Sequence, residues 1–414
     1  MPVSTRRSLR GVLSVALVAV IVALPQVASA DEVRDREYWL QEYGISQAWQ
    51  FTKGAGVTIA VIDTGVDSTH VDLQGVVVGG TDVSGIGAPD GQTPVGGVSS
   101  EHGTMVASLA AGRGHGDDAG VMGSAPEATI LSVSMSFQGT SIPADDQIAR
   151  AVIWAVDNGA DVISLSLTRN TRDWPVSWDD AFGYAEDNDV VVVAAAGNRS
   201  AGTEAVGAPA TMPGVLTVGG VDRGGFASAT ASSQGITIGV MAPSEDLVGA
   251  YPGDRYAEWA GTSGATPIVA GIVALVRSAY PNLDAANVIN RILSTATPVT
   301  TTTPDPLYGY GLVDAYQAVV ADVPRVSSNP LGTLEDWISI YRRGNDEQVV
   351  YPLGPIDPPA IPEARQLGEI PPTWRPEGSE SIPAVMITLL LVSLFGVGGV
   401  ALYTVNRAVR KPVD

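Results

Sequence analysis

The hydrophobic positions of this chain form two kinds of segment. Short runs that are apolar at every position are typical of strands buried on both faces, and longer segments with apolar residues three or four apart are typical of helices. Because the two kinds alternate, the pattern predicts an α/β fold with a mostly parallel central sheet and helices on both of its faces. We expect strands at residues 57–62, 130–133, 162–167, 190–195, 215–218 and 236–241, and helices at residues 104–112, 145–158, 177–188, 263–280 and 284–296.

Two further apolar segments lie near the ends of the sequence. Residues 11–24 follow a basic start and precede the small residues of 28–30, an order typical of a secretory signal peptide cleaved after Ala30. Residues 382–403 carry no charge and are long enough, at about 1.5 Å per residue, to cross a hydrocarbon core about 30 Å thick. The alternative for them is a buried core helix. The basic tail that follows predicts a single transmembrane helix, with the C-terminus in the cytoplasm and the preceding chain outside.

Between these segments the composition changes once. Prolines recur through residues 323–381 without apolar periodicity, which indicates an extended linker. Trp337, Ile338, Ile340 and Tyr341 could instead dock on the domain or on a partner. The predicted organisation is a signal peptide (1–30), a globular domain (31–322), a Pro-rich linker (323–381), a transmembrane helix (382–403) and a cytoplasmic basic tail (404–414), and we expect residues 32–52 to wrap around the domain.

Composition narrows the classes of function. The chain holds 23 Lys and Arg against 44 Asp and Glu, a formal charge of −21 that argues against nucleic acid as a partner. It has no Cys, which excludes disulfides, Cys-ligated metals and a thiol nucleophile. The three histidines are His70, His102 and His115, so any imidazole chemistry must use one of them. His70 and His115 lie in polar loop sequences, and we expect both to be solvated.

Four candidate residues stand at the ends of predicted strands and helices. Asp63 follows a strand in Asp-Thr-Gly, His102 begins a helix in His-Gly-Thr, Asn198 ends a strand in Ala-Ala-Ala-Gly-Asn, and Ser263 begins a helix in Gly-Thr-Ser-Gly-Ala-Thr-Pro. Taken singly, each is more typical of a turn residue, a structural histidine or a helix cap than of a catalytic residue. Taken together, the order Asp, His, Ser on an α/β framework is that of a nucleophilic serine with its base, and an amide such as that of Asn198 can donate to an oxyanion.

With these motifs the chain resembles the subtilisin-like serine peptidases over residues 56–320. The resemblance implies a three-layer fold, with Ser263 as nucleophile, His102 as general base and then acid, and Asp63 as the residue that orients the imidazole. It implies that Asn198 and the backbone N–H of Ser263 form the oxyanion hole. It also implies that an extended substrate pairs with Ser164, Leu165, Ser166 and Leu167, and that Ala195, Ala196 and Gly197 line the pocket for the residue before the scissile bond.

The sequence departs from the family pattern after Leu167. Members usually continue with Gly-Gly, whereas this chain has Thr168 and Arg169. We expect these side chains to narrow the cleft or to offer a positive charge to an acidic substrate residue. The chemistry requires no cofactor and no metal; structural calcium stays open, because no loop has convincing ligand spacing.

The order of segments is similar to that of the mycosins, the membrane-anchored peptidases of type VII secretion systems. This resemblance implies a serine endopeptidase on the outer face of the cell membrane, which hydrolyses a protein or peptide substrate through an acyl-enzyme and is linked to a type VII secretion complex. Two alternatives stay open: a scaffold component of such a complex, with proteolysis secondary, and a general surface protease.

Overall fold

The computed structural model describes residues 32–342, except 98 and 117, together with residues 365 and 366. The predicted signal peptide, the predicted transmembrane segment, the basic tail and most of the Pro-rich linker lie outside the described residues. Within the described part, helix α8 (Thr262–Ala279) has the length and apolarity of a membrane span, but 83% of it is buried inside the fold. Helix α8 is therefore the core helix of the domain.

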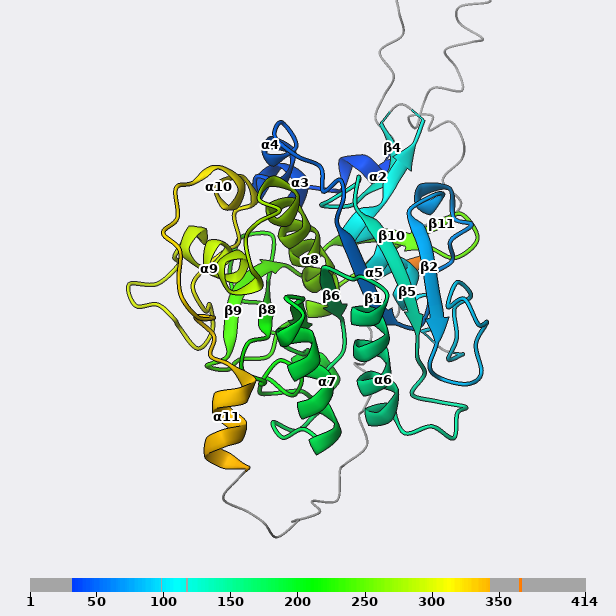
Figure 1. Cartoon of the computed structure of the whole chain (residues 1–414). Coiled ribbons are helices and arrows are strands. Elements are labelled where there is room, and N and C mark those ends of the chain that lie inside the picture. Colours follow the sequence, from blue (N-terminus) through cyan, green and yellow to red (C-terminus); the bar gives the residue numbers. More distant parts are fainter. Residues whose placement is uncertain (1–31, 98, 117, 343–364, 367–414) are drawn as a thin grey trace, which may run out of the picture. The chain divides into compact units, whose positions relative to one another are not determined.

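A seven-stranded sheet forms the centre of the domain (Figure 1). Every neighbouring pair in it is parallel, and the apolar runs of the sequence supply all strands but the edge strand β2, so the predicted α/β fold is confirmed. The strand order is β2 (Val77–Asp82), β5 (Thr129–Ser134), β1 (Thr58–Asp63), β6 (Val162–Leu165), β7 (Val191–Ala195), β8 (Leu216–Val221) and β9 (Ile238–Pro243).

Helices cover both faces of the sheet (Figure 1). On one face lie α6 (Ala144–Asp157) and α7 (Val176–Asp187), and on the other lie α5 (His102–Ala111) and α8. Small residues let α5 and α8 approach closely: a Cβ on Gly271 would lie 2.8 Å from the carbonyl oxygen of Ala110. All ten residues of α5 are buried, so its first residue, His102, is held by a rigid core element.

The segments before and after the central sheet also pack on the domain. Before β1, the short helices α2 (Glu32–Asp35), α3 (Trp39–Glu42) and α4 (Ile45–Ala48) bury Val33, Trp39 and Ile45 completely, as expected for a segment that wraps around the domain. After the sheet come α9 (Ala285–Thr295), α10 (Ala315–Val320) and α11 (Leu334–Tyr341). The remaining elements are η1 (Val71–Leu73), β3 (Arg113–His115), β4 (Ala119–Met122), η2 (Arg199–Ala201), β10 (Leu247–Tyr251), β11 (Arg255–Trp259) and β12 (Arg365–Gln366).

Helix α11 belongs to the sequence predicted to be an extended linker, yet it lies against α7. The centres of the Trp337 and Trp174 rings lie 4.4 Å apart. Arg342 Nε forms an ion pair with Asp179 Oδ2 at 2.5 Å. Ile340 and Tyr341 on the same helix are exposed. The packed domain in the structure therefore includes residues 323–342.

Candidate active site

Asp63 and His102 form a buried pair at the carboxyl end of β1. His102 Nδ1 lies 2.8 Å from Oδ1 and 2.9 Å from Oδ2 of Asp63. Both side chains are at most 5% exposed. The other ring nitrogen, Nε2, is buried and has no hydrogen-bond partner within the described residues. The imidazole is thus oriented by a carboxylate on one side and has a free nitrogen on the other.

The Asp-Thr-Gly and His-Gly-Thr motifs hold this pair through mutual hydrogen bonds. Thr64 Oγ1 accepts a hydrogen bond from the N–H of Gly103 at 2.9 Å, and Thr104 Oγ1 accepts one from the N–H of Asp67 at 2.9 Å. A Cβ on Gly103 would lie 2.3 Å from the carbonyl oxygen of Gly65, so only glycine permits this approach. The two threonines are positioning residues that the sequence reasoning did not single out, although their place in the motifs could have identified them.

Ser263 is the second residue of α8 and is also buried. Its hydroxyl donates to the carbonyl oxygen of Ser166 at 3.2 Å, and the Ser166 hydroxyl donates to the carbonyl oxygen of Ser263 at 2.9 Å. Trp259 links this helix end to the imidazole: its ring lies 5.5 Å from that of His102 at an interplanar angle of 88°, and a Cβ on Gly264 would lie 3.3 Å from its Cζ2 atom. Trp259 therefore lies between the imidazole of His102 and the start of α8, which carries Ser263.

The amide of Asn198 is oriented by the residue before Ser263. Asn198 Oδ1 accepts hydrogen bonds from the backbone N–H of Thr262 at 2.8 Å and from its hydroxyl at 3.0 Å. With the oxygen held in this way, Nδ2 is the group left to donate to a ligand. Gly261, with a φ of 142°, is required beside it, because a Cβ there would lie 3.0 Å from Asn198 Nδ2. Thr262 is another positioning residue that the sequence reasoning missed.

The predicted substrate strand needs a correction at its first residue, Ser164. Ser164 lies between Val61 of β1 and Val193 of β7, and Leu165 pairs with Ala194. Ser164 therefore has a neighbouring strand on both sides and cannot take up a substrate strand, whereas Leu165 is the last residue of β6 and is paired only with β7. Ser166 and Leu167 lie beyond the end of β6, and Ser166 contacts Ser263.

Residues 195–197 end β7 next to this segment, with Ala195 as the last residue of the strand and Ala196 and Gly197 following it. The N–H of Gly197 donates to Thr262 Oγ1 at 3.1 Å, which ties this segment to the start of α8. The two segments after β6 and β7 therefore both reach the residues around Ser263.

Arg169 does not offer its charge to a substrate. It is 1% exposed, its Nη1 lies 2.8 Å from Asp145 Oδ1, and its guanidinium lies 5.6 Å from the centre of the Trp178 ring. Burial raises the pKa of Asp145 above its ordinary value, although the Arg169 charge acts in the opposite direction. The expectation of a positive charge in the cleft is wrong, because residues from α6 and α7 enclose the guanidinium.

The other two histidines make other contacts. The prediction of a solvated His70 is wrong: the residue is fully buried, with Nε2 3.0 Å from the carbonyl oxygen of Arg255. His115 is partly exposed, and its Nδ1 lies 2.6 Å from the buried carboxylate of Asp72. Within the described part of the chain, no group of three or more His, Asp or Glu side chains is arranged to hold a metal ion.

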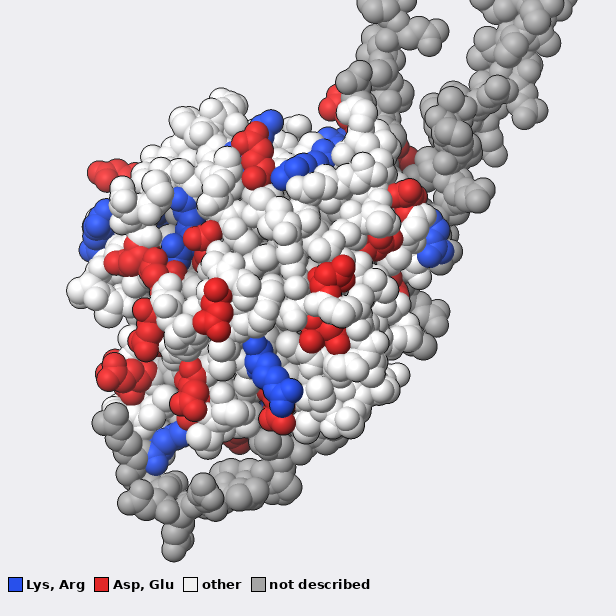
Figure 2. Space-filling model, turned by 45° about the vertical axis from the view of Figure 1, so that its right-hand side comes forward, with Lys and Arg blue, Asp and Glu red and all other residues white. Residues whose placement is uncertain are grey.

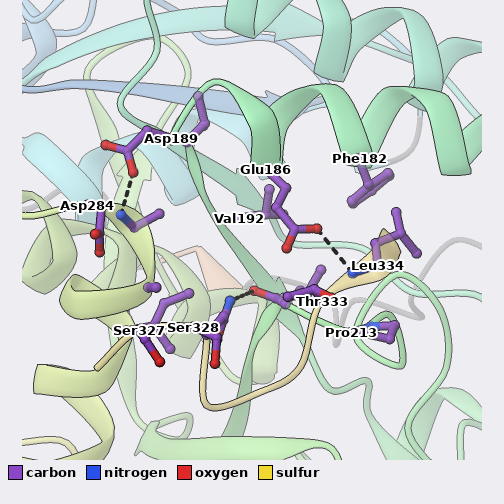
Figure 3. A pocket seen from close by; sticks show the side chains of 17 residues that line it. Phe182, Glu186, Asp189, Val192, Pro213, Asp284, Ser327, Ser328, Thr333 and Leu334 are labelled. Atoms are coloured by element: carbon purple, nitrogen blue, oxygen red, sulfur yellow. Dashed lines mark hydrogen bonds between the residues drawn. The ribbon is translucent and has the colours of Figure 1, made fainter. Parts of the chain in front are cut away.

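A cavity of about 300 Å³ lies at the opposite end of the strands (Figure 3). It is lined by α7, the start of α9, residues around the start of β7 and before β8, and residues 327–329, 333 and 334, and its lining includes none of the candidate residues. Glu186 points into it and accepts a 3.1 Å hydrogen bond from the N–H of Leu334. Burial, together with neighbouring carboxylates, raises the pKa of Glu186 above its ordinary value.

Comparisons with known proteins show what the chain is similar to. A profile described as Subtilase family matches residues 54–311. Thermitase of Thermoactinomyces vulgaris is 37% identical over 69% of this chain and 96% of its own length. Among solved structures, MycP1 with the N-terminal propeptide removed is 30% identical with a TM-score of 0.60, over 70% of this chain and 98% of its own. MycP3 protease from the type VII (ESX-3) secretion system is 31% identical with a TM-score of 0.58, over 69% and 88%.

Proposed function

From the premise that this chain belongs to the subtilase family and is a serine endopeptidase, we propose that Asp63, His102 and Ser263 are its catalytic triad. The observation that carries the proposal is the buried Asp63–His102 pair, in which Nδ1 of the imidazole meets the carboxylate and Nε2 has no hydrogen-bond partner within the described residues. A histidine that acts as general base needs one ring nitrogen held by a hydrogen bond, which sets its tautomer, and the other ring nitrogen free to accept a proton.

The hydroxyl of Ser263 attacks the carbonyl carbon of the scissile peptide bond while His102 Nε2 takes its proton. In the structure this hydroxyl donates to Ser166, so attack begins with its rotation toward Nε2. Asp63 keeps the proton on Nδ1 and stabilises the imidazolium. His102 then gives the proton to the leaving amine, and water hydrolyses the acyl-enzyme by the same steps in reverse.

The oxyanion is held by Asn198 Nδ2 and by the backbone N–H of Ser263 at the start of α8. Thr262 fixes the amide before the substrate arrives, so this donor is already oriented when negative charge develops. The positive end of the α8 helix dipole lies at the same point and also stabilises the negative charge.

Hydrolysis of an unstructured protein by the full-length chain tests the triad, with the Ser263→Ala, His102→Ala and Asp63→Asn variants alongside. We expect each variant to lose at least about 10⁴-fold in kcat, with the triple variant no worse than Ser263→Ala alone, because the three act as a unit. Undiminished hydrolysis by Ser263→Ala would refute the assignment.

We further propose that the enzyme is anchored in the cell membrane, faces outward and serves a type VII secretion system. The apolar residues 382–403 and the basic tail support the anchor. The likeness to MycP1 and MycP3 supports the secretion role.

Secretion in a deletion strain, complemented with the wild-type chain or with Ser263→Ala, separates proteolysis from a scaffold role. We expect only the wild-type chain to restore processing of a secreted substrate. Full restoration of both secretion and processing by Ser263→Ala would contradict the proposal, and protease accessibility of the domain in intact cells checks its orientation.

A further inference from the structure

The segment that departs from the family pattern also fills the space next to the reacting residues. Thr168 stands between two glycines: a Cβ on Gly197 would lie 3.1 Å from Thr168 Cγ2, and a Cβ on Gly207 would lie 2.9 Å from Thr168 Oγ1. Thr168 itself is buried. Its side chain therefore occupies the gap between the segment after β6 and the segment after β7.

A second threonine closes the same gap. Thr203 Cγ2 and Ser233 Oγ would lie 2.8 Å and 2.9 Å from a Cβ on Gly197. Thr203 is buried, and its hydroxyl donates to Asn170 Oδ1 at 2.7 Å. Gly197 is thus surrounded by the methyl groups of Thr168 and Thr203 and by the Ser233 hydroxyl.

The wall that carries Thr168 is fixed. The N–H of Arg169 donates to the carbonyl oxygen of Ala208 at 2.7 Å, and the Arg169 side chain is anchored by its ion pair with Asp145. Threonine is β-branched and has few rotamers, and here its hydroxyl also donates to the carbonyl oxygen of Arg169 at 3.2 Å. The side chain of Thr168 therefore cannot swing aside to admit a large group.

The gap lies on the acyl side of the bond to be cut, an assignment that rests on the proposed function. Ser166 contacts Ser263 on one wall, and Gly197 precedes Asn198 on the other. A substrate whose carbonyl carbon meets Ser263 and whose carbonyl oxygen meets Asn198 directs the side chain of that same residue between these walls.

We propose that Thr168, assisted by Thr203, restricts the residue before the scissile bond to glycine, alanine or serine. A larger side chain at this position displaces well-packed methyl groups, which is the costly kind of overpacking. Since a single methylene changes discrimination by on the order of 10- to 200-fold, a leucine or phenylalanine loses at least about 100-fold against alanine.

The test measures how fast Ser263 of the purified full-length chain is modified by two peptidyl phosphonates that differ only in their first side chain, alanine or phenylalanine. A small fluorophosphonate without such a side chain measures the reactivity of the serine itself. The variants are Thr168→Gly, which empties the gap, and Thr168→Ser, which removes only the methyl group. Thr171→Gly is the matched control, because Thr171 lies three residues further along and is exposed.

We expect the wild-type chain and Thr171→Gly to favour the alanine probe by at least about 100-fold. Thr168→Gly should lower this ratio at least about tenfold and Thr168→Ser by less; each probe rate is divided by the fluorophosphonate rate of the same protein, so that a change in the reactivity of the serine itself cancels. Equal rates for the two probes in wild type, or an unchanged ratio in both Thr168 variants, would overturn the proposal. Absence of any fluorophosphonate reaction in wild type would instead remove the proposed function beneath it.

Discussion

The hydroxyl of Thr262 offers a sharp test of how the proposed oxyanion hole is held. It donates to Asn198 Oδ1 at 3.0 Å and accepts the N–H of Gly197 at 3.1 Å. Thr262→Val removes both bonds and leaves the Thr262 N–H as the only recorded donor to that oxygen within the described residues. The amide of Asn198 then loses one of two anchors, while the serine and its base stay as they are.

The size of the effect follows from these contacts. One hydrogen bond contributes a net of about 0.5 to 1.5 kcal/mol, so the less well oriented Asn198 should lower kcat by about 2- to 12-fold with little change in KM. The buried N–H of Gly197 loses its acceptor, which should cost about 1 to 3 kcal/mol in the free energy of unfolding. Loss of the whole Asn198 amide, in Asn198→Ala, should be larger, about 10² to 10³ in kcat.

A double-mutant cycle provides the assay. If Thr262 acts through Asn198, then Thr262→Val should have almost no further effect on kcat in the Asn198→Ala background. Stopped assays at a temperature well below unfolding, together with urea unfolding of all four proteins, separate turnover from stability. A full 2- to 12-fold effect of Thr262→Val in both backgrounds would refute the reasoning, because the hydroxyl would then act on the oxyanion directly.

Three other outcomes follow from the structure. Arg169→Met should lower the free energy of unfolding by about 3 kcal/mol in urea titrations, because it removes a buried guanidinium and leaves the partly buried Asp145 without its partner, and should leave the preference for acidic substrate residues unchanged; unchanged stability would contradict this. The pKa of Glu186 is raised, so its contribution to stability is present below the unfolded pKa and is lost as pH rises through the folded pKa. Glu186→Gln should therefore melt higher than wild type at pH 7 and equal to it near pH 4; a lower melting temperature at pH 7 would be the contrary result. Trp337→Ala should loosen α11, at a cost of about 0.5 to 1.5 kcal/mol for the lost ring pair, seen as faster amide exchange in residues 334–341; unchanged exchange would mean that the Trp174 contact does not hold the helix.

The sheet was predictable because its strands are apolar at every position, a pattern that sequence alone reveals. The edge strand β2 was missed, since only Val77 and Val78 of its six residues are large and apolar. The β10–β11 hairpin was also missed, although Pro252 and Gly253 between its strands are a turn signal. Edge strands and hairpins depend on partners that lie elsewhere in the chain.

The motifs around the candidate residues could be recognised in the sequence for a related reason: each combines a polar residue with the glycines and threonines that its packing requires. Gly103 is an example, because a side chain at this position would collide with the backbone carbonyl oxygen of Gly65. Burial of polar side chains was not predictable in this way. Arg169 and His70 stand in polar sequence, and only the assembly of distant elements around them removes them from water.

Figure 2 shows why charge alone says little about where a substrate binds. Acidic groups are scattered over the face shown rather than gathered at one place, so the negative charge of the chain does not mark a cleft. Specificity in this account comes instead from the shape of the gap between Gly197 and Gly207.

The central claim is that Ser263 is an activated nucleophile. The most direct measurement is covalent labelling of the folded full-length chain by a fluorophosphonate, with the modified residue located by mass spectrometry and with Ser263→Ala as the control. The account predicts stoichiometric modification of Ser263 in the wild-type chain and none in the variant. A folded wild-type chain that resists the probe, or one labelled equally in the Ser263→Ala variant, would contradict it.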